Sequence, residues 1–247
     1  MGWLGKMTGN GKESYRNRAQ IVSDYFHVST RRIHQLSEFT DDKILRKYTA
    51  TEYGIDPYIL RTMMDYTRYM ESELVTRALQ EFNVAMKQLS ILDFGCSVSD
   101  YGIFFARLGA DVTAYDYQKY IDFVRFRFER ENLKVHTVTI PSDYSQLLRG
   151  KDLVIFGEVL EHMEHPFTIL KTCAGLKTKY IFTSHYPYGT ENYFNISGHT
   201  KSAEAEQTKS LEFLKENYSE VVLESKKRLW ILRNGTSHNG ATKRFNT

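Results

Sequence analysis

The sequence predicts an α/β protein with a doubly wound, mostly parallel, seven-stranded sheet and an N-terminal helical cap. Three observations predict this fold. After Ser90, short runs of β-type residues alternate with amphipathic segments, which is the pattern of βαβ units. The last two β-type runs have no helix between them, so an antiparallel pair is expected there. The length of 247 residues suits one such domain with an appendage.

Seven strands and four helices are expected in the α/β region. The strands fall at about residues 90–95, 111–116, 135–140, 152–158, 179–185, 219–225 and 228–233. The helices lie between them, at about residues 100–108, 119–131, 166–176 and 203–217.

Three regions are predicted along the chain. Residues 1–88 form the helical cap region, in which Asp56 followed by Pro57 marks a helix start. Apolar residues then recur at helical spacing from Leu60 to Phe82. Residues 89–234 form the α/β domain, and residues 235–247 are a polar, flexible tail.

The composition narrows the classes of function. A net charge of +3 and a pI near 8.6 are less basic than a dedicated nucleic-acid binder usually shows. Two cysteines are too few for a disulfide framework and suit a reducing compartment. Neither a signal peptide nor an apolar run of membrane-spanning length is found, so a cytoplasmic protein that does not enter a membrane is expected.

The segment ILDFGCSVSD, residues 91–100, is typical of the strand and turn that begin a nucleotide-binding domain. Asp116 ends the next strand, 21 residues after Gly95, where such sites place a carboxylate for the ribose hydroxyls. Ser97 and Asp100 replace glycines that a dinucleotide-binding loop would need. The acidic Asp93 instead suits a ligand with an ammonium group, and S-adenosylmethionine is a nucleoside of that kind.

Together with GADVTAYD and DLVIFGEVLEHMEHP, this segment resembles the successive motifs of class I S-adenosylmethionine-dependent methyltransferases. The resemblance covers about residues 88–233 and implies a Rossmann-like transferase fold that binds S-adenosylmethionine. Carried over, it implies that Asp116 binds the ribose and that Glu158 lies beside the transferred methyl group. The methionine part is expected to contact Asp93, Gly95, Cys96, Ser97 and Ser99, and the adenine to contact Ser142 and Asp143. Tyr117 and Gly157, which adjoin Asp116 and Glu158, complete the expected cofactor contacts.

Ser97 and Ser99 depart from the family, which usually has glycine at both positions. If residue 97 needs a positive φ, a side chain costs roughly 1 kcal/mol, enough to weaken binding about tenfold. The Ser97 hydroxyl could instead donate to the methionine carboxylate. The alternative for Asp93 and Asp116 is that they only cap a strand end and a helix.

The turn GEVLEHMEHP offers a second candidate constellation. If residues 158–162 form a helical turn, Glu158, Glu161 and His162 share one side and can bind Mg²⁺ or another divalent cation. The E-x-x-E-H pattern resembles ubiquinone-pathway O-methyltransferases and small-RNA 2′-O-methyltransferases. In the RNA enzymes a downstream histidine completes the metal site, and His199 is preferred over His185 for that place.

The remaining alternatives concern catalysis and the acceptor. With or without a metal, His162 is expected to take the proton of the acceptor, and Glu158 and Glu161 to orient it. The alternative is that the two glutamates are helix-terminal charges and that His162 acts alone as a general base or is only structural. The predicted function is O-methylation of a small molecule. The alternatives are a metal-dependent RNA 2′-O-methyltransferase and a non-catalytic, degenerate binding protein. Two basic groups that could favour RNA are expected to be solvated: Arg125, Arg127 and Arg130 on one helix, and Lys226, Lys227 and Arg228 at the final hairpin.

Overall fold

A computed structural model gives the structure of residues 15–38, 54–65, 67–140, 142–188, 199–224, 226–233 and 243–244. The chain divides into two units, residues 1–66 and 67–247. None of the helices in the described ranges is long and apolar enough to cross a membrane.

The first unit contains three described helices, α2 (Tyr15–Phe26), α3 (Thr30–Ser37) and α5 (Pro57–Met64). The predicted start of α5 is confirmed: Asp56 Oδ1 accepts hydrogen bonds from the amides of Tyr58 and Ile59, and Pro57 occupies the first turn. The fully buried Arg18 of α2 donates through Nη1 to the carbonyl of Met63, at 2.9 Å, near the end of α5. This bond satisfies a helix-terminal carbonyl that has no partner within its own helix.

The second unit holds the α/β fold. Its helical elements are α6 (Thr67–Glu81), η1 (Met86–Gln88), α7 (Asp100–Arg107), α8 (Gln118–Arg130), α9 (Tyr144–Leu148), η2 (Leu160–His162), α10 (Pro166–Gly175) and α12 (Lys201–Asn217). Its strands are β1 (Ser90–Phe94), β2 (Asp111–Asp116), β3 (His136–Thr139), β4 (Leu153–Phe156), β5 (Tyr180–Ser184), β6 (Tyr218–Glu224), β7 (Lys227–Leu232) and β8 (Lys243–Arg244). All seven predicted strands and all four predicted helices are confirmed. Their observed ends lie within about two residues of the predicted ends, which is the usual uncertainty of such boundaries.

The sheet has the order β3-β2-β1-β4-β5-β7-β6-β8. Strands β1 to β5 pair in parallel, and β7 is antiparallel to both β5 and β6. The doubly wound fold and the antiparallel final pair are therefore confirmed. The predicted seven-stranded, mostly parallel sheet is confirmed, and the two-residue strand β8 adds a short parallel pairing with β6 from within the segment predicted to be a flexible tail.

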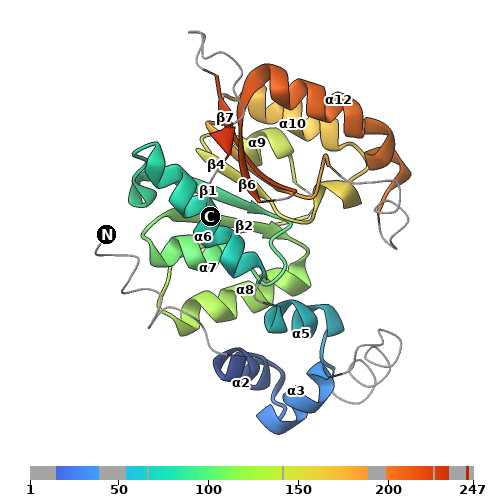
Figure 1. Cartoon of the computed structure of the whole chain (residues 1–247). Helices are drawn as coiled ribbons and strands as arrows, with labels where there is room; N and C mark the ends of the chain where they lie inside the picture. The colour runs from blue at the N-terminus through green and yellow to red at the C-terminus, as the bar shows by residue number, and fades with distance from the viewer. Residues whose placement is uncertain are drawn as a thin grey trace. The chain divides into compact units, whose positions relative to one another are not determined.

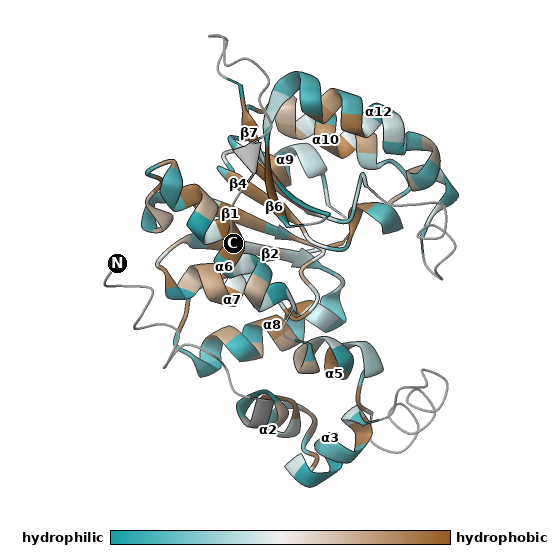
Figure 2. Ribbon diagram, in the orientation of Figure 1, coloured by the Kyte–Doolittle hydropathy of each residue, from teal (hydrophilic) through white to brown (hydrophobic). Residues whose placement is uncertain are grey.

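Each face of the sheet buries its own apolar cluster, since successive strand residues point to opposite faces. Ile91 and Ile155 belong to the cluster under α6, α7 and α8, whereas Leu92 and Val154 belong to the cluster under α9, α10 and α12. Figure 1 shows these two helical layers on either side of the sheet. Figure 2 shows hydrophobic strands in the middle and hydrophilic residues on the outer helices.

The unit boundary differs from the boundary predicted after residue 88. Helix α6 belongs to the second unit because Val75, Ala78 and Leu79 are buried in the same apolar cluster as α7. The helical spacing that runs from residue 60 to residue 82 belongs to two helices, since Asp65 has extended backbone (φ −95°, ψ 125°) and ends α5.

Candidate cofactor and active site

The loop from Gly95 to Ser99 connects β1 to α7 at the carboxyl end of the sheet. The strand order reverses between β1 and β4, and open α/β sheets bind ligands at such a switch point. Gly95, Ser97 and Ser99 have positive φ values of 67°, 53° and 56°. Ser97 therefore meets the condition under which the missing glycine costs free energy.

Gly95 itself cannot carry a side chain. A Cβ atom there would lie 2.4 Å from Cγ2 of Val159, which follows β4. The amides of Gly95 and Cys96 both donate to the carbonyl of Tyr115 on β2, at 2.9 and 3.1 Å. The loop is thus held tightly between the ends of β2 and β4.

Asp116 fastens the loop from the end of β2. Its Oδ2 accepts a hydrogen bond of 2.7 Å from the Ser97 amide, and its Oδ1 accepts one of 2.7 Å from the Tyr117 amide. Burial raises the pKa of Asp116, although these two amides oppose the shift. The predicted spacing therefore does bring Asp116 to the loop.

Asp93 fastens the other side of the loop. Its Oδ2 accepts hydrogen bonds from Ser99 Oγ at 2.7 Å and from the Gly102 amide at 3.1 Å. Burial raises the pKa of Asp93 to about 7, and the bonds from Ser99 and Gly102 and the charge of Arg68 reduce the rise.

The two serines play different parts. Ser99 Oγ is bound to Asp93, and a Cβ atom at Gly102 would lie only 2.2 Å from it. Ser97 Oγ is buried and has no hydrogen-bond partner among the described residues. A buried hydroxyl without a partner costs free energy, so Ser97 is suited to donate to a ligand.

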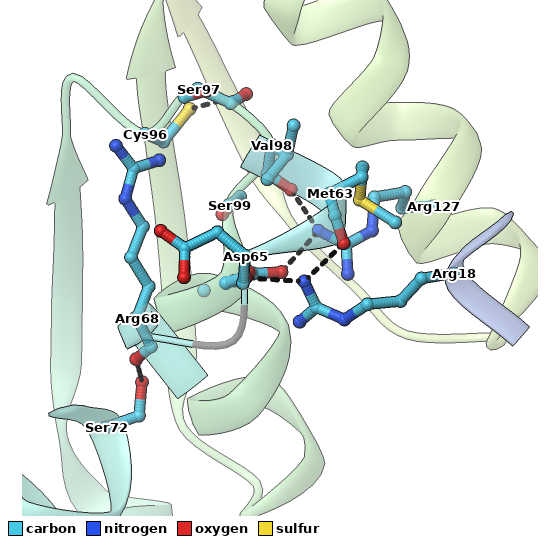
Figure 3. A network of polar contacts seen from close by, with 12 residues as sticks. Arg18, Met63, Asp65, Arg68, Ser72, Cys96, Ser97, Val98, Ser99 and Arg127 are labelled. Atoms are coloured by element: carbon cyan, nitrogen blue, oxygen red, sulfur yellow. Dashed lines mark hydrogen bonds and ion pairs between the residues drawn. The ribbon is translucent and has the colours of Figure 1, made fainter. Parts of the chain in front are cut away.

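Arg68 is a site residue that the sequence analysis missed. It lies in the first turn of α6, and its positive charge lowers the pKa values of Asp93, Cys96 and Asp116 against the larger effect of burial. Figure 3 shows its side chain extending toward Cys96. No motif signals this residue, because α6 precedes the recognisable loop and was assigned to the cap.

Arg127 was expected to be a solvated charge, and this prediction is wrong. Its side chain is only 1% exposed and its Nη1 lies 2.9 Å from Asp100 Oδ1. It also donates to the carbonyl of Val98, as Figure 3 shows. The hairpin cations Lys227 and Arg228 are likewise held in ion pairs, with Glu71 and Glu220, rather than solvated.

The predicted adenine and ribose neighbours make local contacts. Ser142 Oγ donates to the carbonyl of Thr139, at 2.8 Å, and Asp143 caps α9 through the Ser145 amide, also at 2.8 Å. The Tyr117 side chain, by contrast, is 58% exposed.

The turn after β4 does not have the predicted helical form. Element η2 begins at Leu160, so Glu158 lies outside it, and Glu158 Oε1 lies 3.3 Å from Nδ1 of His185. Gly157 is buried, and a Cβ atom there would lie 2.9 Å from the ring of Tyr101. Glu158 is consequently separated from the predicted metal set.

Three of the four predicted metal ligands do come together. Ligand atoms of Glu161, His162 and His199 all lie within 4.8 Å of one another. Thr200 holds His199 in place, since its amide donates to the carbonyl of Glu161 at 2.9 Å and its Oγ1 donates to that of Met163 at 2.7 Å. Glu161 is buried, whereas His162 is exposed.

Comparison with known proteins gives the fold an independent basis. The family model described as tellurite resistance protein TehB matches residues 59–179. The curated proteins contain no sequence that matches this chain significantly.

Solved structures with a similar fold include a methyltransferase and a TehB protein. Magnesium protoporphyrin IX methyltransferase (ChlM) from Synechocystis PCC 6803 with bound SAH is 20% identical, with a TM-score of 0.52, over 78% of this chain and 100% of that chain. Its form with bound SAM is 18% identical, with a TM-score of 0.51, over 88% and 97%. TehB from Haemophilus influenzae is 16% identical, with a TM-score of 0.51, over 71% and 67%. The chain is therefore similar to TehB-like class I methyltransferases in sequence over residues 59–179, and it shares their fold.

Proposed function

We propose that this protein, which has the Rossmann-like fold of class I methyltransferases, transfers a methyl group from S-adenosylmethionine to an oxygen of a small molecule. One observation carries the proposal. Asp93, Ser97 and Asp116 meet around a single loop at the switch point of the sheet, through bonds of 2.7 Å from Ser99 to Asp93 and from Ser97 to Asp116.

The residues of this loop fit the cofactor chemically. The methionine part carries an ammonium group and a carboxylate. Both donors to Asp93 use Oδ2, so Oδ1 is the oxygen that can accept the ammonium. The unpartnered Ser97 hydroxyl and the Arg68 guanidinium supply donors for the carboxylate.

Asp116 is assigned to the ribose hydroxyls, because a carboxylate has lone pairs left after accepting two amides. Ser142, Asp143 and Tyr117 are assigned to the adenine side, at the carboxyl ends of β2 and β3. Gly157 and Glu158 are assigned to the methyl-transfer side, at the end of β4.

The cluster of Glu161, His162 and His199 is proposed to hold a divalent cation. Two imidazoles and one carboxylate suit Zn²⁺ or Mn²⁺ better than Mg²⁺, which prefers oxygen ligands. When bound, such a cation would polarise and orient the acceptor oxygen. Coordination would commit the His162 lone pair, so the predicted role of His162 as a general base applies only without metal.

The metal proposal is tested by titrating the protein with Mn²⁺ and following free Mn²⁺ by electron paramagnetic resonance. Stoichiometric binding by the parent and its loss in His199→Ala and Glu161→Gln are expected. His165→Ala is the matched control, because His165 is an exposed histidine beside the same turn and lies outside the cluster. Equal binding by all variants would refute the assignment.

The structure removes one reason to favour RNA as the acceptor. Arg127, Lys227 and Arg228 belong to the two basic groups that could have bound phosphates, and all three are engaged in ion pairs within the protein. The small-molecule acceptor is therefore retained as the proposal.

Isothermal titration with S-adenosylmethionine and S-adenosylhomocysteine tests the cofactor site. Micromolar binding is expected for the parent, with a large loss in Asp116→Ala. Asp116→Asn keeps an oxygen for the Ser97 amide, and so separates loss of the charge from collapse of the loop. Asp111→Ala is the control, since Asp111 begins the same strand at its other end and is exposed.

The same titration tests the degenerate-protein alternative. If the parent does not bind and Ser97→Gly does, the serine disables the site and the non-catalytic alternative replaces the enzyme. If Asp116→Ala binds as tightly as the parent, the ribose assignment is wrong.

A further inference from the structure

A buried carboxylate outside every motif lies at one end of a hydrogen-bonded chain. Glu71 of α6 is 2% exposed, and its Oε2 accepts a hydrogen bond from the hydroxyl of Tyr101. Its Oε1 lies 3.1 Å from Lys227 Nζ and accepts a bond of 3.4 Å from Ser184 Oγ. Burial and the neighbouring Glu71 raise the pKa of Tyr101 far above its usual value, so Tyr101 stays a donor.

The chain continues from Ser184 to the methyl-transfer side of the sheet. Ser184 Oγ lies 3.1 Å from Nδ1 of His185, and the same Nδ1 lies 3.3 Å from Glu158 Oε1. Strands β4 and β5 are neighbours, so His185 stands next to the end of β4, where the resemblance places the reacting methyl group.

These contacts favour one tautomer of His185. Ser184 donates its only hydroxyl hydrogen to Glu71, so its oxygen accepts from the ring. The ionised Glu158 carboxylate is also an acceptor. Nδ1 therefore carries the hydrogen, and the lone pair of the neutral ring lies on Nε2. Orientation of an imidazole by a carboxylate through Nδ1 is the arrangement that general bases use.

Hydrogen bonds hold the backbone of His185 in the left-handed region. Its φ of +66° is unfavourable for a residue with a side chain. The conformation is held by the His185 amide, which donates to the carbonyl of Lys226 at 3.1 Å, and by the Tyr188 amide, which donates to the carbonyl of His185 at 2.7 Å.

We propose that His185 accepts the proton of the methyl acceptor, with Glu158, Ser184 and Glu71 as positioning residues. This inference rests on the proposed methyl transfer and names its substrate class, a neutral hydroxyl compound. An acceptor that is already an oxyanion needs no base. His162 cannot serve as the base while it binds a cation, whereas His185 lies outside the metal cluster.

The step balances. The acceptor oxygen uses an electron pair to form a bond to the methyl carbon, and the carbon–sulfur bond breaks with its pair remaining on sulfur. The sulfonium becomes a neutral thioether. The hydroxyl proton passes to Nε2 of His185, and the resulting imidazolium lies beside the negative charge of Glu158.

His185→Gly is the informative variant, because glycine adopts this backbone conformation without strain and the variant should fold. Radiolabelled methyl transfer from S-adenosylmethionine is measured with a small-molecule extract of the source cells, separated into hydroxyl and acidic fractions. His185→Gly should lower transfer to hydroxyl compounds about 10²-fold to 10⁴-fold and leave any transfer to compounds of the acidic fraction unchanged. Added imidazole should restore the hydroxyl reaction, which a merely structural role would not allow.

Two further variants complete the test. Ser184→Ala should lower kcat with little change in KM. His136→Gln should match the parent, since His136 is an exposed histidine at the start of β3. Equal rates for the parent and His185→Gly, or a reduced rate that imidazole does not restore, would overturn the proposal.

Cofactor titration separates this inference from the proposed function. The parent and His185→Gly are both expected to bind S-adenosylhomocysteine equally. Binding of the cofactor without transfer to any hydroxyl compound would overturn the role of His185 and leave the cofactor site intact. Failure of the parent to bind S-adenosylhomocysteine would overturn the proposed function itself.

Discussion

Acidification should weaken the binding of S-adenosylhomocysteine more than the binding of 5′-methylthioadenosine. Both ligands carry adenosine and a thioether, but only the first has the ammonium group that Asp93 is proposed to hold. Because burial raises the pKa of Asp93 to about 7, a drop in pH below 7 protonates this carboxyl in the free protein. The ligand then has to displace that proton in order to bind.

The size of the effect follows from the pKa. With a value of about 7, the ionised fraction of Asp93 is about one half at pH 7 and about one hundredth at pH 5. If only the ionised form binds the ammonium, the dissociation constant rises about 50-fold, or about 2 kcal/mol. At pH 6, binding should release about 0.9 proton per ligand for the same reason.

Isothermal titration in buffers of different ionisation enthalpy measures both quantities. 5′-Methylthioadenosine is the matched control, because its ribose still contacts Asp116, whose pKa burial also raises. The difference between the two ligands therefore isolates Asp93. Ser99→Ala removes a hydrogen bond that lowers the pKa of Asp93, so it should move the midpoint to higher pH. Equal losses for both ligands, or no proton release, would refute the assignment of Asp93 to the ammonium.

The free energy of unfolding of the cofactor-free protein provides a second test of Asp93. It should fall as the pH rises, whereas the binding of S-adenosylhomocysteine should strengthen. The folded pKa of Asp93 is above its unfolded value, so the folded chain binds the proton more tightly. That stabilisation is complete below about pH 4 and is lost as the pH rises to about 7. Relative to Asp93→Asn, which does not titrate, the parent should lose about 2.3 kcal/mol of unfolding free energy in total between pH 5 and pH 7, as measured by urea unfolding. If the difference in unfolding free energy between the parent and Asp93→Asn stays constant with pH, Asp93 is ionised over the whole range.

Three further substitutions test how the loop and its neighbours are built. Ser97→Gly should weaken S-adenosylhomocysteine binding about fivefold by removing one hydrogen bond, and calorimetry should show no change for 5′-methylthioadenosine. Arg127→Met should lower the free energy of unfolding by about 3 kcal/mol because it removes the buried ion pair with Asp100; urea titration of the double variant with Asp100→Asn should recover part of the loss. Gly157→Ala should cost about 1–3 kcal/mol, since its Cβ would lie 2.9 Å from Tyr101, and an unchanged melting temperature would contradict that contact.

The α/β elements could be predicted because parallel strands that are buried on both faces have continuous apolar sequences. Leu153–Phe156 is such a run, and each of its residues is buried. The loop carboxylates Asp93 and Asp116 could be predicted from their spacing at the ends of adjacent strands. Strand β8 could not, because two residues in a polar segment carry no periodic signal and pair only once β6 is in place.

The sequence was least informative about charged residues on helices. Arg68, Glu71 and Arg127 look like ordinary solvated helix charges, and α8 around Arg127 has the polar sequence RFRFER. Which of these charges are buried depends on the packing of α6, α7 and α8 on the sheet. Glu158 was misplaced for a related reason, since the turn after β4 bends before it becomes helical. Side-chain partners distant in sequence cannot be found from local spacing.

The structural and functional interpretations of Asp93 and Asp116 are compatible. Both carboxylates fasten the loop. Asparagine at position 93 keeps an acceptor oxygen for Ser99 and Gly102, and asparagine at position 116 keeps one for Ser97 and loses only the bond from the Tyr117 amide, in both cases without an ionised group. Asp93 and Asp116 are only 1% and 6% exposed, and burial raises the pKa of both, so each carries a cost that a purely structural fastening would avoid. Buried carboxylates with raised pKa values at a switch point are what a cationic, hydroxyl-bearing ligand would use. The asparagine variants of both residues should therefore keep the fold and lose the cofactor.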